Sequence, residues 1–137
     1  MKLAISVLVI VHLIAILWHG DAHSLLGIEL PTLKNIFIYT VILAAPIVSA
    51  VVVWTRFMIL GAGLFAFSMV GALVFGVYHH YILVSSDNIA HLPMGLPEVH
   101  VQFIESAALI AIIEILAVLS GFFALGVAYG SLVTKNR

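Results

Sequence analysis

The chain has 137 residues, of which 64% are hydrophobic and only 8% are charged, with a formal net charge of -1. Soluble domains are about 45–50% apolar and about 25% charged, so this composition predicts an integral membrane protein. So few basic residues exclude the polybasic surface that nucleic-acid binding needs. The sequence contains no cysteine, which excludes disulfides, thiolate metal sites and iron–sulfur clusters.

Four apolar segments are long enough to cross a bilayer, which takes about 20 helical residues each. In chain order they cover residues 3–20, 35–55, 57–85 and 102–133. The second and third segments are joined by the very short "WTRF" stretch, which predicts a tight hairpin. We therefore expect an all-α fold, a single four-transmembrane-helix antiparallel bundle that comprises residues 1–137.

The few basic residues predict how this bundle is oriented. Lys2, Arg56, Lys135 and Arg137 fall on one side of the membrane if the helices alternate, and Lys34 alone falls on the other. Because basic residues favour the cytoplasmic side, we expect both termini in the cytoplasm of an integral cell-membrane protein. The two long loops then face the outer, extracytoplasmic side.

This orientation gathers histidines at the outer face. Neutral imidazole is a common ligand of copper, zinc and iron, and carboxylates complete such sites. Six histidines and an aspartate from distant chain positions reach this one depth, so we predict an outward-facing, histidine-rich transition-metal site that serves redox chemistry or metal handling, with copper favoured and zinc or iron as alternatives. The predicted ligands are His19, His23, His79, His80, Asp87, His91 and His100.

Part of the outer loop resembles a known copper-binding pattern. The Asp87-x-x-x-His91 spacing with the later His100 resembles the copper-ligand pattern of one membrane subunit of the copper membrane monooxygenases. The resemblance is confined to this loop, and the spacing to His100 is shorter here. It therefore favours copper as the metal and does not extend to the activity of that family.

Two other functions are compatible with the sequence. The first is a haem b protein that transfers electrons, with His19 and either His79 or His80 as axial ligands from the first and third helices. The second is a non-catalytic accessory subunit, whose histidines only furnish the surface of a larger complex. An absorption spectrum and elemental analysis separate the three.

Two ionisable residues are expected deeper in the membrane. His12 lies within the first helix and Glu114 near the middle of the fourth, where a lone carboxylate is costly. We expect His12 and Glu114 to form a buried polar link, with a role in proton transfer. The alternative is a protonated Glu114 bonded to Ser49 or Ser68.

Small residues predict close helix packing. Gly126 and Gly130 form a Gly-x-x-x-Gly motif in the fourth helix, and Gly61 and Gly63 lie in the third. The motif serves packing within the chain and association between chains equally well. The expected partners are the lipid bilayer and a second copy or a larger membrane complex.

Overall fold

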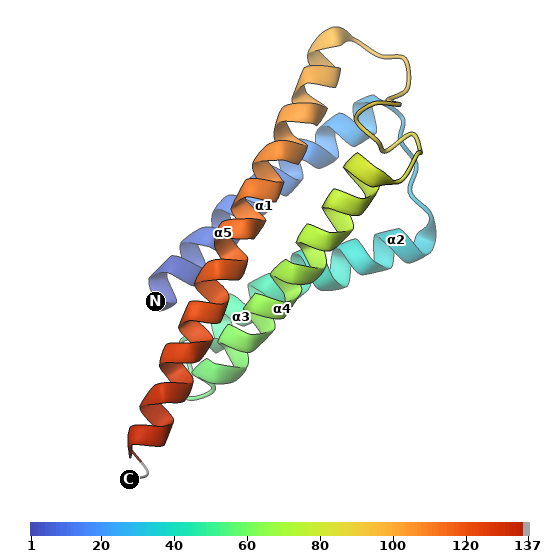
Figure 1. Cartoon of the computed structure of the whole chain (residues 1–137). Helices are drawn as coiled ribbons and strands as arrows, with labels where there is room; N and C mark the ends of the chain where they lie inside the picture. The colour runs from blue at the N-terminus through green and yellow to red at the C-terminus, as the bar shows by residue number, and fades with distance from the viewer. Residues whose placement is uncertain (136–137) are drawn as a thin grey trace.

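A computed structural model describes residues 1–135, and these residues form an all-helical arrangement (Figure 1). Its elements, in chain order, are α1 (Lys2–Leu25), α2 (Thr32–Phe37), the π-helix η1 (Ile38–Ala44), α3 (Ala45–Val52), α4 (Met58–Val77), the π-helix η2 (Tyr78–Ile82) and α5 (Pro97–Lys135). Because α2, η1 and α3 are continuous, and η2 continues α4, four helices are long and apolar enough to cross a membrane. Arg137 and the side chain of Lys135, used to predict the orientation, lie outside the described residues.

The helix boundaries differ from the predicted ones at the end of the molecule that holds the histidines. The first helix continues past Gly20 to Leu25, because the glycine that caps it lies only at position 27. Gly27 adopts φ 63°, its N–H donates to Ser24, and the N–H of Ile28 donates to the carbonyl of His23. This is a Schellman cap, in which glycine accepts the left-handed conformation that ends a helix. His23 therefore lies on α1 rather than in a loop.

The third and fourth membrane helices also end and begin differently. η2 ends at Ile82, and α5 begins at Pro97, five positions before the predicted start at residue 102. Proline suits the first position of a helix because its missing N–H would have no helical partner there. The intervening loop folds back against η2, where the N–H of Ile89 donates to the carbonyl of His80 over 3.0 Å.

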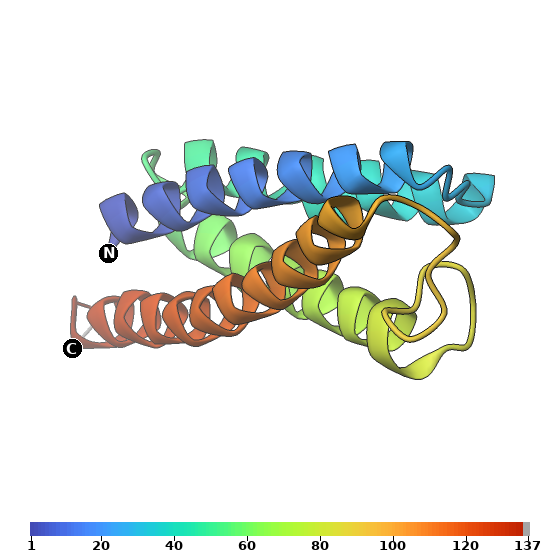
Figure 2. The same ribbon diagram turned by 90° about the horizontal axis from the view of Figure 1, so that it is seen from above.

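The helices form two layers that diverge at one end (Figure 2). α5 packs along both α4 and α1. α3 packs on α4, and the two are joined by the tight hairpin. Both chain ends lie on one side in Figure 2, whereas the loop between η2 and α5 lies on the other. One hydrophobic cluster, which includes Phe65 and Met69, occupies the half near the hairpin.

A second, smaller cluster surrounds the histidines. Ala22 and Leu26 at the end of α1 pack with Val99 and Phe103 at the start of α5. Ile89 and Leu92 from the folded-back loop cover this cluster. This packing holds the end of α1, the loop after η2 and the start of α5 next to one another.

Candidate metal centre

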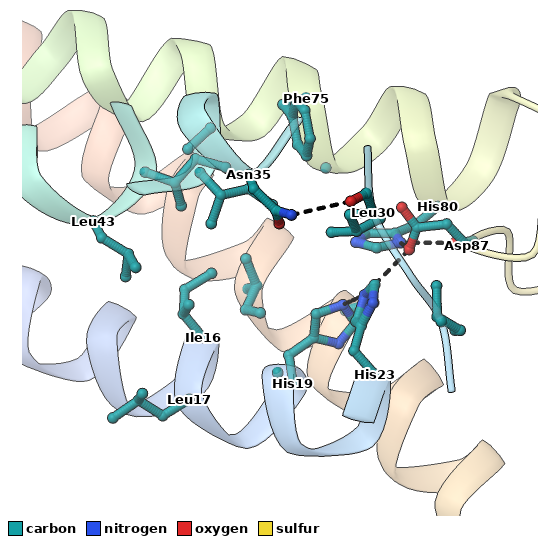
Figure 3. Close-up of a pocket in the computed structure, with 18 of the residues that line it drawn as sticks. Ile16, Leu17, His19, His23, Leu30, Asn35, Leu43, Phe75, His80 and Asp87 are labelled. Atoms are coloured by element: carbon teal, nitrogen blue, oxygen red, sulfur yellow. Dashed lines mark hydrogen bonds and ion pairs between the residues drawn. The ribbon is translucent and has the colours of Figure 1, made fainter. Parts of the chain in front are cut away.

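Three histidines from two helices meet at the diverging end of the molecule. His19 and His23 project from α1 toward His80 of η2 and Asp87 of the following loop (Figure 3). One ring nitrogen from each of the three histidines lies within 4.8 Å of the others, a separation short enough for one metal ion to bind all three. The site is therefore a histidine triad that can hold a metal ion.

Two imidazoles are oriented by hydrogen bonds on the ring nitrogen that faces away from the triad. Ser106 donates its hydroxyl proton to the α5 backbone, so its oxygen accepts the Nδ1–H of His19 at 2.8 Å. The Nδ1–H of His80 donates to the carbonyl of Asp87 over 2.9 Å. A hydrogen bond of this kind fixes the tautomer of a ligating histidine. It assigns the lone pair to Nε2 in both His19 and His80.

His23 completes the triad, and its Nε2 is about as far from Nε2 of His19 as two ligands of one metal ion are from each other. Their two Nε2 atoms are 3.1 Å apart. Two nitrogens bound to one tetrahedral ion at 2.0–2.1 Å are separated by about 3.3 Å. Because Nε2 of His19 is an acceptor, Nε2 of His23 carries the proton between them. A metal ion would take the place of that proton.

Asp87 supplies negative charge to the same position. Its buried Oδ1 lies 3.1 Å from Nε2 of His23 and 3.2 Å from Nδ1 of His80, without a hydrogen bond of good geometry among the described residues. Burial alone would raise the pKa of Asp87, but the imidazoles of His23 and His80 outweigh it and hold that pKa well below its usual range. Asp87 is therefore a carboxylate that can balance a bound cation.

An aromatic ring forms the wall behind the triad. Phe103 is completely buried, and its ring centroid lies 4.6 Å from that of His19, 5.0 Å from that of His23 and 5.4 Å from that of His80. It excludes water from one side and restricts all three rings. Sequence reasoning missed both Phe103 and Ser106; their spacing with Ala107 and Glu114 on one helical face was the signal that could have found them.

The remaining predicted ligands lie outside the triad. Nδ1 of His79 donates to the carbonyl of Phe75 in its own helix, and its ring packs on that of Phe75. Nε2 of His100 donates to the carbonyl of Pro93, and His91 is exposed in the loop. Of the Asp87, His91 and His100 pattern, the structure thus brings only Asp87 to the triad.

The geometry of the triad argues against a haem bound by His19 and His80. The rings of His19 and His80 are 4.8 Å apart between centroids and meet edge to face. Two axial ligands of a haem lie on opposite sides of the porphyrin, and these rings leave no room for that plane between them. A haem held by His19 and His80 therefore does not fit this arrangement.

His12 and Glu114 form the buried contact expected from the sequence. Nε2 of His12 donates to Oε1 of Glu114 over 3.1 Å, and the two side chains are 0% and 2% exposed. The hydroxyls of Ser49 and Ser68 donate instead to carbonyls of their own helices, so they are not the partners of Glu114. The role of His12 and Glu114 in proton transfer stays a prediction.

A cavity of about 800 Å³ connects these two polar regions. Its lining includes the triad, Asp87 and Glu114, and otherwise consists mainly of apolar and aromatic side chains from α1, η1, α4 and α5. Ile16, Leu43 and Phe75 are among them (Figure 3). The three histidines and Glu114 thus line one common space.

Comparison with known proteins identifies no relative. No family model matches the chain, and neither a curated protein nor a solved structure does. The function has to be argued from the geometry of the site.

Proposed function

We propose that the protein binds one transition-metal ion through His19, His23 and His80, with Asp87 as the charge-balancing group and fourth ligand. The 3.1 Å separation of the Nε2 atoms of His19 and His23 carries this proposal, together with the tautomers assigned by Ser106 and the Asp87 carbonyl. One proton is shared between these two nitrogens, and a cation can replace it. A donor set of imidazole and carboxylate without sulfur favours copper, zinc or iron, and we favour copper.

The proposed setting is a four-helix antiparallel bundle with both termini in the cytoplasm and the triad at the outer end of the membrane. Lys2 and Arg56 support this orientation. Lys2 begins α1 and lies over the Trp54 ring of the hairpin that contains Arg56, and the N-terminus lies on the side opposite the η2–α5 loop (Figure 2). The metal would then serve redox chemistry or metal handling at the extracytoplasmic side. The buried position of the triad favours chemistry inside the protein over exchange at the surface.

Metal binding by the purified full chain tests the proposal. The protein, incubated separately with Cu²⁺, Zn²⁺ and Fe²⁺ and then dialysed, is expected to retain about one equivalent of its preferred metal by elemental analysis. His80→Ala removes a ligand and should weaken binding more than about 100-fold, beyond the effect typical of a supporting group. His91→Ala and His100→Ala are matched controls, because both residues lie outside the triad.

The variants also separate metal binding by the triad from metal binding by other residues. Retention of a full equivalent by His80→Ala, or loss of metal on changing His91, would contradict the assignment of the ligands. Failure of the wild-type chain to retain any of the three metals would contradict the function itself.

A further inference from the structure

The cavity between the triad and Glu114 reaches two membrane-spanning helices. Leu17 of α1 and Tyr39 of η1 both line it, and their side chains are 70% and 65% exposed. Both residues belong to helices apolar enough to span a membrane. A molecule dissolved in the bilayer would therefore reach the cavity between these two side chains.

The inner end of the cavity carries a hydrogen-bonding group that is only partly used. Oε1 of Glu114 accepts the proton of His12, whereas Oε2 lies on the side of Gly76, 3.8 Å from the position of a Cβ at that glycine. Gly76 and Ala111 are small residues of the cavity lining and leave space beside this carboxyl group. A carboxyl oxygen of a buried residue thus faces a mainly apolar space, where a ligand group can bond to it. The other polar residues of the lining include Asp21, Ser24, Glu29 and Asn35.

The spacing of the two polar ends limits what can bridge them. Ser106, which orients His19, and Glu114 are eight residues apart on α5, which corresponds to about 12 Å along the helix. A ring with oxygens at opposite positions and a hydrogen bond of about 2.8 Å at each spans about 11 Å. Such a ring reaches from Glu114 to the histidine end, and a hydrocarbon tail on it would leave between Leu17 and Tyr39.

We propose that the cavity binds a lipid-soluble para-quinone or its quinol, with one ring oxygen on Glu114 and the other at the metal centre. The volume of about 800 Å³ is within the range of pockets that hold small organic ligands. A carboxyl group suits both redox states, because it donates to a quinone oxygen when protonated and accepts from a quinol hydroxyl when ionised. The second contact rests on the proposed metal-binding function.

Binding of decylubiquinone to the full chain in nanodiscs tests this inference. The measured quantity is saturable quinone above the amount that dissolves in empty nanodiscs, expected at about one molecule per chain. Gly76→Leu fills the cavity beside Glu114 and should abolish saturable binding. Gly126→Leu is the matched control, because Gly126 does not line the cavity and a Cβ there meets no described atom within 4 Å.

Two further measurements address the ring oxygens. Glu114→Leu keeps roughly the size of the side chain and removes its hydrogen-bonding oxygens, and should weaken binding about tenfold. Decylbenzene has a similar tail but no ring oxygens, and should not compete. Equal competition by decylbenzene, or unchanged quinone binding in Gly76→Leu, would overturn the inference.

Metal content, measured on the same nanodiscs, separates this inference from the proposed function. A wild-type chain that retains metal but binds no saturable quinone overturns the quinone site alone. A wild-type chain without metal overturns the metal centre, while quinone binding that depends on Gly76 and Glu114 supports the inner half of the site.

Discussion

The protonation state of each imidazole in the triad follows from the group that its other ring nitrogen contacts. Ser106 and the carbonyl of Asp87 both accept a proton from Nδ1, and this leaves Nε2 of His19 and of His80 as acceptors. His79 also donates from Nδ1, to the carbonyl of Phe75 in its own helix, so its tautomer matches that of the two ligands. Its position on the helix, rather than its hydrogen bonding, therefore keeps it out of the triad.

At this scale the serine that orients His19 gives the clearest prediction. Ser106→Ala removes the acceptor for the Nδ1–H of His19 but leaves every candidate ligand in place. Metal affinity is expected to fall about 10- to 100-fold, as is typical when a group that orients a ligand is lost. Metal titration of the purified variant measures the change.

Ser131→Ala is the matched control on the same helix. The hydroxyl of Ser131 bonds only to the carbonyl of Ala128, far from the triad. Equal affinities in Ser106→Ala and wild type would show that Ser106 does not control the orientation of His19.

Among the elements, the π-helix η2 decides which histidine of the "YHHY" stretch enters the site. The N–H of Leu83 donates to the carbonyl of Tyr78 over 2.7 Å, five residues back. Each residue of this wider turn advances by less than the 100° of an α-helix. His80 is thereby rotated onto the face that carries Ala72 and Gly76, where an uninterrupted α-helix would favour His79.

Close approach of α5 to α4 holds the other side of the site in position. A Cβ at Gly121 would lie 2.9 Å from Cα of Ala66, whereas one at Gly126 would meet nothing within 4 Å among the described residues. Gly126 and Gly130 therefore do not provide the close contact within the chain, although they form the recognisable motif. Gly121 provides it on α5.

This difference predicts opposite outcomes for two similar substitutions. Gly121→Val should destabilise the protein by about 1–3 kcal/mol, because backbone and side chain of Ala66 must move away. Gly126→Val should leave the stability nearly unchanged. Thermal unfolding of the two variants in the same detergent compares them, and similar melting temperatures would contradict this account of the packing.

The whole molecule is apolar on its outside as well as in its core. Large apolar residues such as Leu33 and Ile14 lie outside, at 80% and 63% exposure, whereas His12, Glu114 and Ser106 are buried. Lipid contacts satisfy the apolar surface, and the buried polar groups bond to one another. The candidate metal ligands His19 and Asp87 likewise lie in the interior rather than on an exposed loop surface.

The orientation of the whole molecule can be tested directly, because the chain has no cysteine of its own. Met94, fully exposed in the loop before α5, and Thr55, in the hairpin before α4, provide two labelling positions. In intact cells a membrane-impermeant maleimide is expected to label Met94→Cys and not Thr55→Cys. After permeabilisation both should react, and the reverse order in intact cells would refute cytoplasmic termini.

The sequence by itself determined the membrane character and the four spanning segments, because hydrophobicity over about 20 residues depends only on local composition. It also predicted the pairing of His12 with Glu114, because two buried ionisable groups at similar depth have few other partners. The gathering of histidines at one end followed from helix length and loop placement in the same way.

Only the tertiary structure decided which of those histidines meet. The selection of His80 over His79 depends on a single π turn, and that of Asp87 over His91 depends on how a loop folds back. Phe103 and Ser106 join the site because α5 packs against α1. These are contacts between segments that are remote in sequence, and their free energies depend on both partners. A local stretch of sequence therefore does not predict them.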